Sequence, residues 1–372
     1  MKLIIYTAAA LLCVACSTEQ PRKIDSLCRA LDGKFTIGAA IDTAIVNGLR
    51  PEADSLVRKH FNSIVAENCM KCMYVHPAED RYYFDDADRF VDYGERNNME
   101  IIGHCLVWHS QMAPWFCYDD KGELVEPEVL KQRIVDHVTT IVSHYKGRVR
   151  GWDVVNEVVN EGGALRESPL SKIMGEEFIY TAFEAAHAAD PDAQLYLNDY
   201  GMDDAGRRET YVRILRELKN RGLRVDAIGM QGHFGMEYPD AAEFEKSLEA
   251  YAAEGVKVMI TEWDMSALPY ISRSANVGDT VAFMKKLNPY PDSLPDSVSN
   301  IWNDRMATFF NIFDKHSADI QRVTAWGVDD GCSWKNDFPM KGRKEYPLLF
   351  DRDFQPKPFV RDIIDRANKQ NE

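Results

Sequence analysis

Two glutamates of this 372-residue chain each follow a short apolar run. Glu157 comes directly after residues 151–156, and Glu262 comes directly after residues 256–261. Cleavage of a glycosidic bond needs one carboxylic acid to protonate the leaving oxygen and one carboxylate for the other face of the sugar ring. A single glutamate more often caps a loop or pairs with lysine or arginine, but two at matching strand ends favour this chemistry. A separation of about 5–5.5 Å would make the second carboxylate a nucleophile and the reaction retaining.

The residues near the two glutamates indicate different roles. His233 lies shortly after another apolar run, and a hydrogen-bonded chain from Glu262 through His233 to Asp264 would keep Glu262 ionised, as a nucleophile requires. Glu157 must instead be protonated at rest, and a partly apolar or anionic surrounding would raise its pKa. We therefore expect Glu157 to be the acid/base and Glu262 the nucleophile.

Two neighbouring side chains have both a functional and a structural interpretation. Asn156 is placed to hydrogen-bond a sugar 2-hydroxyl group, a contact that strengthens in the transition state, and a buried structural amide is the alternative. His233 could also be a core histidine whose ring nitrogens are satisfied internally.

Three tryptophans fall at predicted strand ends or just beyond them, at Trp108, Trp326 and Trp334. Indole rings match the apolar faces of sugar rings. Any single tryptophan is more often a core residue, but three at one rim beside paired carboxylates favour a carbohydrate cleft. Trp108 and Trp326, with Glu262 nearby, are the surroundings expected to raise the pKa of Glu157.

These residues need a scaffold that brings several strand ends together. Short β-rich apolar runs alternate with longer amphipathic segments along the chain. We predict strands over residues 35–41, 70–75, 101–107, 149–155, 194–198, 227–231, 256–261 and 323–328. We predict helices over residues 53–66, 87–97, 127–145, 176–189, 206–221, 241–254 and 298–316.

This alternation predicts an α/β fold with a parallel sheet. About eight units, without a GxGxxG or GxxxxGK[ST] phosphate-binding motif, favour a single (β/α)8 TIM barrel, whose catalytic groups lie at the carboxyl ends of the strands. We assign residues 31–368 to this catalytic domain. An insertion at about residues 266–300, rich in Pro, Asn, Asp and Ser, is expected to form a surface loop near the mouth of the barrel.

The first residues have the pattern of an export signal. Lys2 precedes an apolar run that is too short to span a bilayer as a helix. Residues 13–17 resemble a bacterial lipobox, which predicts acylation of Cys16, and ordinary signal cleavage is the alternative because Cys13 stands where leucine is usual. We therefore expect residues 1–16 to form an export signal with a lipobox-like end, and residues 17–30 to form a tether or first helical region. The protein would be exported, either as a membrane-anchored lipoprotein in the periplasm or at the cell surface, or as a secreted protein.

The composition excludes several kinds of partner. The net charge of −15 and the absence of a Lys/Arg stripe argue against nucleic-acid binding. Beyond the export segment six cysteines are scattered through the chain, and we expect free buried thiols, with one disulfide left open. Cys69 and Cys72 form a lone CxxC without a second pair or a histidine pair at zinc spacing, so we expect no metal and no cofactor. We also expect a monomer.

Taken together, the motifs resemble glycoside hydrolase family 10, the endo-β-1,4-xylanases, from about Phe35 to Phe359. The segments that carry the resemblance are Glu67-Asn68-Cys69-Met70-Lys71, Gly103 to Gln111, Trp152-Asp153-Val154-Val155-Asn156-Glu157, Asn198-Asp199-Tyr200, Gln231-Gly232-His233, Ile260-Thr261-Glu262-Trp263-Asp264 and Trp326 to Trp334. The substrate contacts that it implies are Glu67, Asn68, Lys71, His104, Trp108, Asn156, Tyr200, Gln231, His233, Trp326 and Trp334, with His109 and Asp264 in supporting positions.

The resemblance implies retaining endo-hydrolysis of β-1,4-xylosidic bonds in xylan, with Glu157 as acid/base and Glu262 as nucleophile. The chain departs from the family pattern at Cys72, Gly201 and Trp263, where Trp, Asn and Leu are usual. These positions are expected to touch the cleft wall, so they bear on affinity for the glycone and not on the reaction type.

Three other functions stay open at this point. A non-catalytic xylan-binding lipoprotein would explain the lipobox and the cysteine at position 72. A retaining β-1,4-glucanase or mannanase would use the same barrel and the same two carboxylates. A metal hydrolase would gather His104, His109 and His233 at the rim, but none of them has ligand spacing on one helix.

Overall fold

The computed structural model describes residues 23–269 and 285–370, in which strands alternate with helices. The strands are β1 (Thr36–Ile41), β2 (Ser63–Ala66), β3 (Glu100–Trp108), β4 (Gly151–Asn156), β5 (Gln194–Asp199), β6 (Ala227–Met230), β7 (His233–Gly235), β8 (Lys257–Ser266) and β9 (Ile320–Ala325). The helices are α1 (Leu27–Ala30), α2 (Thr43–Val46), α3 (Pro51–His60), α4 (Cys72–Val75), α5 (Asp85–Arg96), α6 (Pro127–His144), α7 (Pro169–Met174), α8 (Glu177–Ala189), α9 (Ala205–Asn220), α10 (Ala241–Ala252), α11 (Asp296–Lys315) and α12 (Pro358–Gln370).

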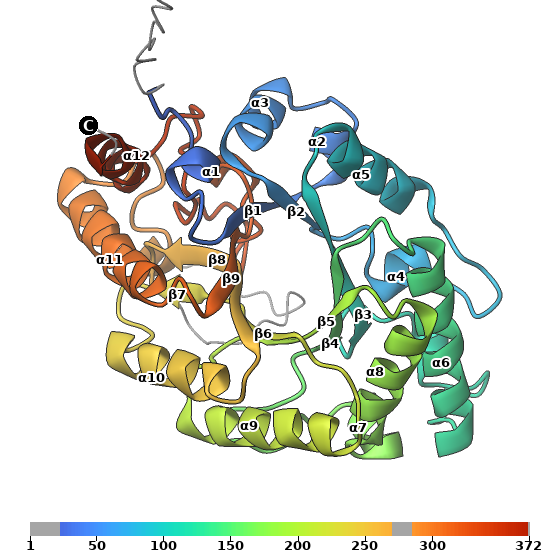
Figure 1. Ribbon diagram of the computed structural model, residues 1–372. Helices are drawn as coiled ribbons and strands as arrows, with labels where there is room; N and C mark the ends of the chain where they lie inside the picture. The colour runs from blue at the N-terminus through green and yellow to red at the C-terminus, as the bar shows by residue number, and fades with distance from the viewer. Residues whose placement is uncertain (1–22, 270–284, 371–372) are drawn as a thin grey trace, which may run out of the picture.

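The strands close into a barrel, which Figure 1 shows from one end. Parallel pairings join them in the order β6-β5-β4-β3-β2-β1-β9-β8, and β6 also pairs with β8. That last pairing joins the two edges of the sheet, so these eight strands leave no edge open. The three-residue strand β7 lies outside this ring and pairs with the carboxyl end of β8. The predicted single (β/α)8 barrel is therefore confirmed.

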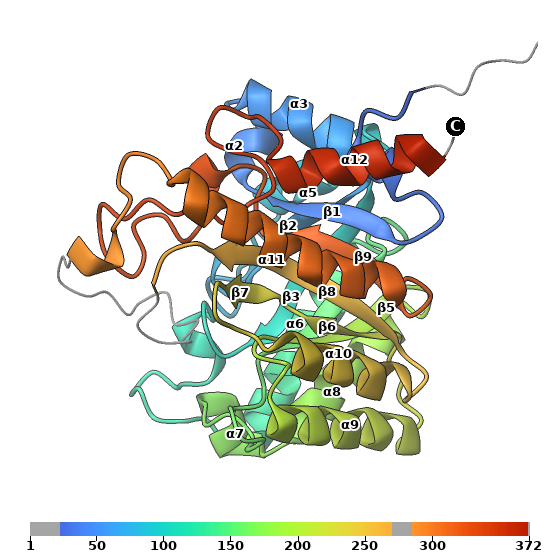
Figure 2. The ribbon, with the colours of Figure 1, turned by 90° about the vertical axis from the view of Figure 1, so that its left-hand side faces the viewer.

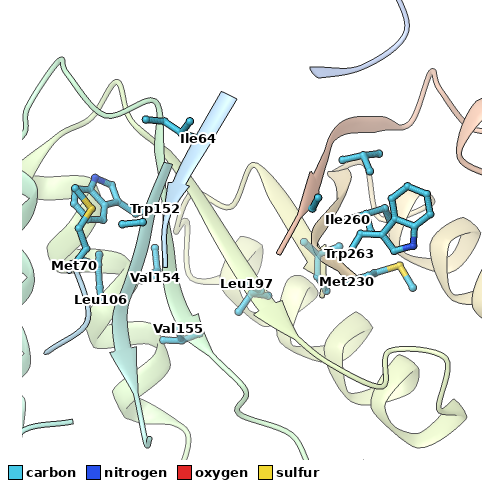
Figure 3. Close-up of a cluster of buried hydrophobic side chains, with 14 of the residues drawn as sticks. Ile64, Met70, Leu106, Trp152, Val154, Val155, Leu197, Met230, Ile260 and Trp263 are labelled. Carbon is cyan, nitrogen blue, oxygen red and sulfur yellow. The ribbon is translucent and has the colours of Figure 1, made fainter. Parts of the chain in front are cut away.

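Apolar side chains pack in two layers, one on each face of the barrel wall. Successive side chains of a strand point to opposite faces. The outer layer packs between the strands and the helices, and Figure 3 shows part of it around Ile64, Trp152 and Ile260. A smaller inner cluster comes from Ala40, Val65, Ile102, Tyr196, Ala227, Met259 and Trp326. Because each fully buried large apolar side chain contributes about 1.5–3 kcal/mol, this wall is a stable support for the groups at its rim.

The helices surround the wall, and the side view in Figure 2 shows α12, α11, α10 and α9 one below another. Local signals set where they begin: the side chains of Asp204 and Asp240 accept backbone N–H groups at the starts of α9 and α10. Helix α1 falls in the segment 17–30 and packs beside α12. Asn368 exchanges two hydrogen bonds with the backbone of Ile24 there, so both ends of the described chain meet on one side of the barrel.

The second strand differs from the prediction. The predicted helix over residues 53–66 ends at His60, the strand β2 occupies residues 63–66, and the predicted strand over residues 70–75 is the one-turn helix α4. A short apolar run does not distinguish helix from strand, and here pairing with β1 on one side and β3 on the other decides the outcome. As a result Glu67 and Asn68, and not Lys71, directly follow the second strand.

Two predicted segments lie wholly or partly outside the described residues. The export segment with Cys16 belongs to residues 1–22, and residues 270–284 form the centre of the predicted insertion at 266–300. On the far side of that gap the carbonyl of Leu287 accepts a hydrogen bond from the buried guanidinium of Arg343. Among the residues that the structure describes, no helix is long and apolar enough to cross a membrane. The six cysteines in the same part of the chain are free thiols. Cys69, Cys72, Cys105 and Cys117 are buried as expected, whereas Cys28 and Cys332 are only partly buried.

Candidate active site

A cleft of about 270 Å³ has both glutamates in its wall. Glu157 directly follows β4, and Glu262 lies within β8, whose pairing with β7 continues past it. The residues that line the cleft are Glu67, Asn68, Lys71, Tyr74, His104, Trp108, Gln111, Asn156, Glu157, His233, Glu262, Trp326 and Trp334. The barrel thus gathers side chains that are spread over more than 260 positions of the sequence.

A second pocket adjoins this cleft and shares His233 and Trp334 with it. Tyr200 and Gln231 line the second pocket. All the residues that the resemblance implies as substrate contacts therefore lie in one of two neighbouring cavities.

Glu262 is surrounded by hydrogen-bond donors. His233 Nε2 lies 3.1 Å from its Oε2, and Asn198 Nδ2 donates to its Oε1 at 2.8 Å. His233 Nδ1 lies 3.0 Å from Asp264 Oδ2, so the imidazole bridges two carboxylates, as the sequence suggested. Burial alone would raise the pKa of the Glu262 carboxyl group, but the charges of His233 and His104 lower it, as does the Asn198 amide. Glu262 is therefore ionised at neutral pH.

His233 is held in its charged form by its two acidic partners. Burial opposes the charge, but Asp264 and Glu262 raise the pKa of the imidazole to about 9. Asp264 is fully buried and is fixed in turn by Lys335 Nζ at 2.7 Å and by Trp334 Nε1 at 2.9 Å. The imidazolium therefore stays beside Glu262 with little freedom to turn.

Glu157 stands in a different environment. Its backbone has a φ of 58°, in the left-handed region that non-glycine residues rarely adopt. Its N–H donates to the Asn198 carbonyl at 2.8 Å, and its own carbonyl accepts from Arg166 Nε at 2.6 Å. Burial and the negative charge of Asp199 raise the pKa of this carboxyl group to about 7, against the opposing effects of Arg166 and Gln231. The Glu157 carboxyl group can therefore hold a proton near neutral pH.

A chain of amides links the two carboxyl groups. Gln231 Nε2 lies 3.2 Å from Glu157 Oε1 and 3.2 Å from Asn156 Oδ1. Asn198 Nδ2 lies 2.9 Å from the same Asn156 oxygen and 2.8 Å from Glu262 Oε1. Both donors occupy the oxygen of Asn156, and its amide nitrogen has no partner in the described chain. This orientation leaves an N–H₂ group available to a sugar hydroxyl group in the cleft.

Another part of the cleft is organised around Lys71. Its Nζ donates to Asn68 Oδ1 at 3.0 Å and to Gln111 Oε1 at 2.9 Å, and it lies 5.2 Å from the centre of the Trp108 ring. Burial lowers the pKa of Lys71, while the charge of Glu262 opposes that change. This group of donors and acceptors is suited to the hydroxyl groups of a sugar.

His104 forms a buried ion pair in the same wall. Its Nδ1 lies 2.8 Å from Asp153 Oδ2, and its ring packs at a steep angle to the Trp326 ring with the ring centres 5.2 Å apart. Burial opposes a charge on the imidazole, but Cys105 and Asp153 raise its pKa to about 10. His104 is therefore a second cation that favours the ionised form of Glu262.

Two of the three departures from the family pattern do not touch the cleft. Trp263 is 2% exposed, and its ring packs against Phe313 and Phe359 in the outer core. Cys72 is buried in that same core, at the first position of α4. The expectation that both form part of the cleft wall is wrong, because strand alternation turns Trp263 away from the side that Glu262 faces, and the turn of α4 directs Cys72 inward.

Gly201, the third departure, does line the adjoining pocket. Its φ is 56°, and a Cβ at this position would lie 2.0 Å from Arg207 Nη1. Arg207 donates to the Tyr200 carbonyl at 3.0 Å and stacks 4.5 Å from the centre of the Tyr200 ring. Glycine at position 201 therefore lets an arginine support Tyr200 from behind.

The rim histidines are not gathered as a group of possible metal ligands in the described part of the chain. His109 lies 6.1 Å from the Trp108 ring and is not among the residues that line the cleft, and burial, with the nearby Arg166, lowers its pKa to about 4. His104 and His233 are each paired with carboxylates. Within the described ranges, three possible ligand atoms approach one another only at Glu245, Glu249 and His316, on the outer helices.

Three residues of the site were not predicted. Asn198 links both halves of the site, Lys335 fixes Asp264, and Arg166 holds the backbone of Glu157. Asn198 ends a predicted strand, and that position was a usable signal. Arg166 and Lys335 lie in loops, where no local pattern marks them. The main causes of the raised pKa of Glu157 were also different, since burial and Asp199 come first and Glu262 contributes less.

Comparison with known proteins agrees with this geometry. Residues 26–366 match the model described as Glycosyl hydrolase family 10. The chain is 43% identical to endo-1,4-β-xylanase A of Xylanibacter ruminicola over 353 residues, which cover 94% of each protein. It is 35% identical to endo-1,4-β-xylanase B of Paenibacillus barcinonensis, over 92% of this chain and 97% of that protein.

Solved structures give the same result. A family 10 endoxylanase from a sugarcane soil metagenome superposes with a TM-score of 0.87 at 38% identity, over 91% of this chain and 99% of that one. A family 10 protein from Paenibacillus barcinonensis gives a TM-score of 0.82 at 35% identity, over 92% and 97% of the two chains. The protein described here belongs to glycosyl hydrolase family 10.

Proposed function

We propose that Glu157 is the acid/base and Glu262 the nucleophile with which this family 10 hydrolase cleaves the β-1,4-linked backbone of xylan internally, with retention of configuration. The observation that supports the assignment is the opposite shift of two buried carboxyl groups. The pKa of Glu157 is raised to about 7, and the pKa of Glu262 is lowered. A general acid must hold a proton and a nucleophile must be ionised, so these environments match one assignment and not its reverse.

In the first step, Glu157 gives its proton to the glycosidic oxygen while Glu262 attacks the anomeric carbon. The bond between that carbon and the glycosidic oxygen breaks, and a covalent glycosyl-enzyme forms. The free amide nitrogen of Asn156 donates to the sugar 2-hydroxyl group, a contact that strengthens as charge develops on the ring. His233 and Asn198 each hold one carboxylate oxygen of Glu262, which fixes the orientation of the nucleophile for the attack.

In the second step, Glu157 acts as a base. Its carboxylate takes a proton from water, the water oxygen attacks the anomeric carbon, and the bond to Glu262 breaks. The negative charge of Glu262 is one cause of the raised pKa of Glu157, and that charge is lost in the covalent intermediate. The pKa of Glu157 therefore falls in the covalent intermediate, where Glu157 must be unprotonated to act as a base. It rises again when the bond to Glu262 breaks and the charge of Glu262 returns.

Xylan as the substrate is supported by the relatives and by the polar groups of the cleft. Both curated relatives described above are named as endo-1,4-β-xylanases. Lys71 and Asn68 supply donors and acceptors for hydroxyl groups, and Trp326 supplies an apolar face beside them. Arg166 donates both to the Glu157 carbonyl and to the Tyr200 hydroxyl group, so Tyr200 lies near Glu157. Because Glu157 protonates the leaving group, we expect the leaving part of the xylan chain to bind near Tyr200.

The test is product analysis over time. Proton NMR of a digest of xylan should show short xylo-oligosaccharides whose new reducing ends appear first in the β configuration. First appearance of the α configuration would contradict the double displacement, and tight xylan binding without release of reducing sugar would favour a binding protein. Hydrolysis rates should be measured on carboxymethyl-cellulose and mannan as well as on xylan. A faster rate on glucan or mannan would contradict the assignment of xylan as the substrate.

Export and anchoring are a separate part of the proposal. Residues 2–15 supply the charged start and apolar run of an export signal, and Cys16 is the expected site of acylation in a bacterial cell. A labelled fatty acid should be incorporated into the parent protein and not into a Cys16→Ser variant, and the variant should be released from the membrane fraction. Equal labelling of both would contradict lipidation. Sedimentation of the mature protein should give the mass of a monomer.

A further inference from the structure

Tyr74 is an aromatic residue of the cleft that none of the sequence motifs includes. It lines the cleft together with Glu67, Asn68 and Lys71. It is 45% exposed, whereas Trp326 in the same cleft is 7% exposed. Within residues 23–269 and 285–370 its ring contacts no other ring or cation, and its hydroxyl group makes no hydrogen bond. A large, half-open aromatic face is therefore available inside the cleft.

The backbone that carries Tyr74 is fixed from several sides. The N–H of Tyr74 donates to the Lys71 carbonyl at 2.9 Å, and the N–H of Met73 donates to the Gln111 carbonyl at 3.0 Å. Just after the helix α4, the indole of Trp115 donates to the carbonyl of His76 at 3.1 Å. The side chains of Lys71 and Gln111 are also hydrogen-bonded to each other, so the backbone around Tyr74 is held by the same two residues that shape this part of the cleft.

The same turn explains why the aromatic face is at position 74. Cys72 and Val75 point into the outer core and are 4% and 0% exposed, while Met73 and Tyr74 are 42% and 45% exposed. A one-turn helix directs neighbouring positions to different sides. An aromatic residue at position 72 would be buried in this chain, and position 74 is the one that reaches the cleft.

We propose that Tyr74 is a binding platform for an additional xylose ring of the main chain, beyond the rings held near Asn68 and Lys71, on the glycone side of the cleaved bond. This inference rests on the proposed function. The glycone side follows from the position of Tyr200 and Arg166, which lie next to Glu157 where the leaving group must be protonated. A phenol ring binds the apolar face of a sugar without matched hydrogen-bond partners, so it suits an outer position that every xylan chain passes.

Tyr83 provides a matched control. It is 49% exposed, close to the exposure of Tyr74, and it lies in the loop after α4. It does not line the cleft, and the Arg81 guanidinium lies 5.5 Å from its ring centre. If exposure of a tyrosine in this region were enough to affect the enzyme, the two residues would behave alike.

The experiment compares a long and a short substrate. Steady-state kinetics on xylohexaose and on an aryl β-xylobioside are measured for the parent, Tyr74→Ala, Tyr74→Phe and Tyr83→Ala. Loss of one stacking contact predicts that Tyr74→Ala lowers kcat/KM on xylohexaose by about five- to tenfold, mainly through KM. The aryl xylobioside has only two sugar rings, so its kcat/KM should not change. Tyr74→Phe should behave as the parent on both substrates, as should Tyr83→Ala.

Several results would overturn the platform. An unchanged rate of Tyr74→Ala on xylohexaose, an equal loss on both substrates, or an equal loss in Tyr83→Ala would each do so. Failure of the unchanged enzyme on both substrates would contradict the proposed function itself, which keeps the two claims separable.

Discussion

Glu157 and Glu262 are buried to nearly the same extent, at 4% and 5% exposure, and a chain of amides connects them. The charges that face the two groups differ in sign. Glu262 lies within a strand and faces two charged imidazoles, His233 and His104. Glu157 lies in a left-handed turn after a strand and faces the carboxylate of Asp199. The same burial therefore gives one carboxyl group a lowered pKa and the other a raised pKa.

The comparison shows that burial does not assign the two roles. Burial is the largest effect on both groups and raises the pKa of both. The charges that the barrel places next to each group decide the direction of the net shift. The first three substitutions below each act on one of the two carboxyl groups, and the fourth changes a core residue next to Glu262, in order of decreasing expected effect on catalysis.

Loss of the nucleophile should have the largest effect. Glu262→Ala removes the group that forms the covalent intermediate, so kcat on xylan should fall by about 10⁴-fold or more. Isothermal titration with xylohexaose should still show binding, and circular dichroism should show an unchanged fold. A variant that keeps more than about one per cent of the parent kcat would contradict the role of Glu262.

Removal of the imidazolium should make the two environments more alike. His233→Phe takes away the donor and the positive charge beside Glu262, so kcat should fall by about 10- to 100-fold. The pKa of Glu262 should rise, and because the nucleophile works only when ionised, the acidic limb of the kcat/KM profile should move to higher pH. His233→Gln keeps a neutral donor and should recover part of kcat. An acidic limb that stays in place in His233→Phe would contradict the effect of the charge.

Substitution of Arg166 should change the pKa of Glu157 and therefore the basic limb of the pH profile. Arg166→Met removes a charge that lowers the pKa of Glu157 and the donor to its carbonyl, so kcat should fall by about tenfold. The acid must be protonated in the first step, so a higher pKa of Glu157 moves the basic limb, expected near pH 7 in the parent, to higher pH. Arg166→Lys keeps the charge and should leave the limb in place. If the basic limb lay at the same pH in Arg166→Met and Arg166→Lys, Arg166 would have only a structural role.

The smallest effect on catalysis is expected from a substitution of Trp263, the residue that follows the nucleophile in the sequence. Trp263 follows Glu262 but packs in the outer core with Phe313 and Phe359. Trp263→Leu should lower the free energy of unfolding by about 2 kcal/mol because it leaves unfilled space. Both limbs of the pH profile and kcat should stay within about twofold of the parent. A shifted acidic limb would mean that the outer layer also tunes Glu262.

Much of the scaffold could be predicted because strand and helix periods are local. The alternation of apolar runs and amphipathic segments placed seven of the eight barrel strands within a few residues. The second strand was misplaced, since Ile64, Val65 and Ala66 also continue an apparent helical pattern. Only their pairing with β1 and β3 makes them a strand. The error placed Lys71 within a predicted strand and hid the helical turn that presents Tyr74.

The sequence by itself determined that Glu157 and Glu262 lie at the same end of one barrel, because side-chain alternation and the carboxyl-end rule depend on residue order. It also brought His233 and Asp264 to the nucleophile. Only the tertiary structure decided the amide chain through Gln231 and Asn198, the hold of Arg166 on Glu157, and the inward turn of Cys72 that leaves Tyr74 in the cleft. These contacts depend on distances of a few ångströms between elements far apart in the chain, and no local pattern encodes such distances.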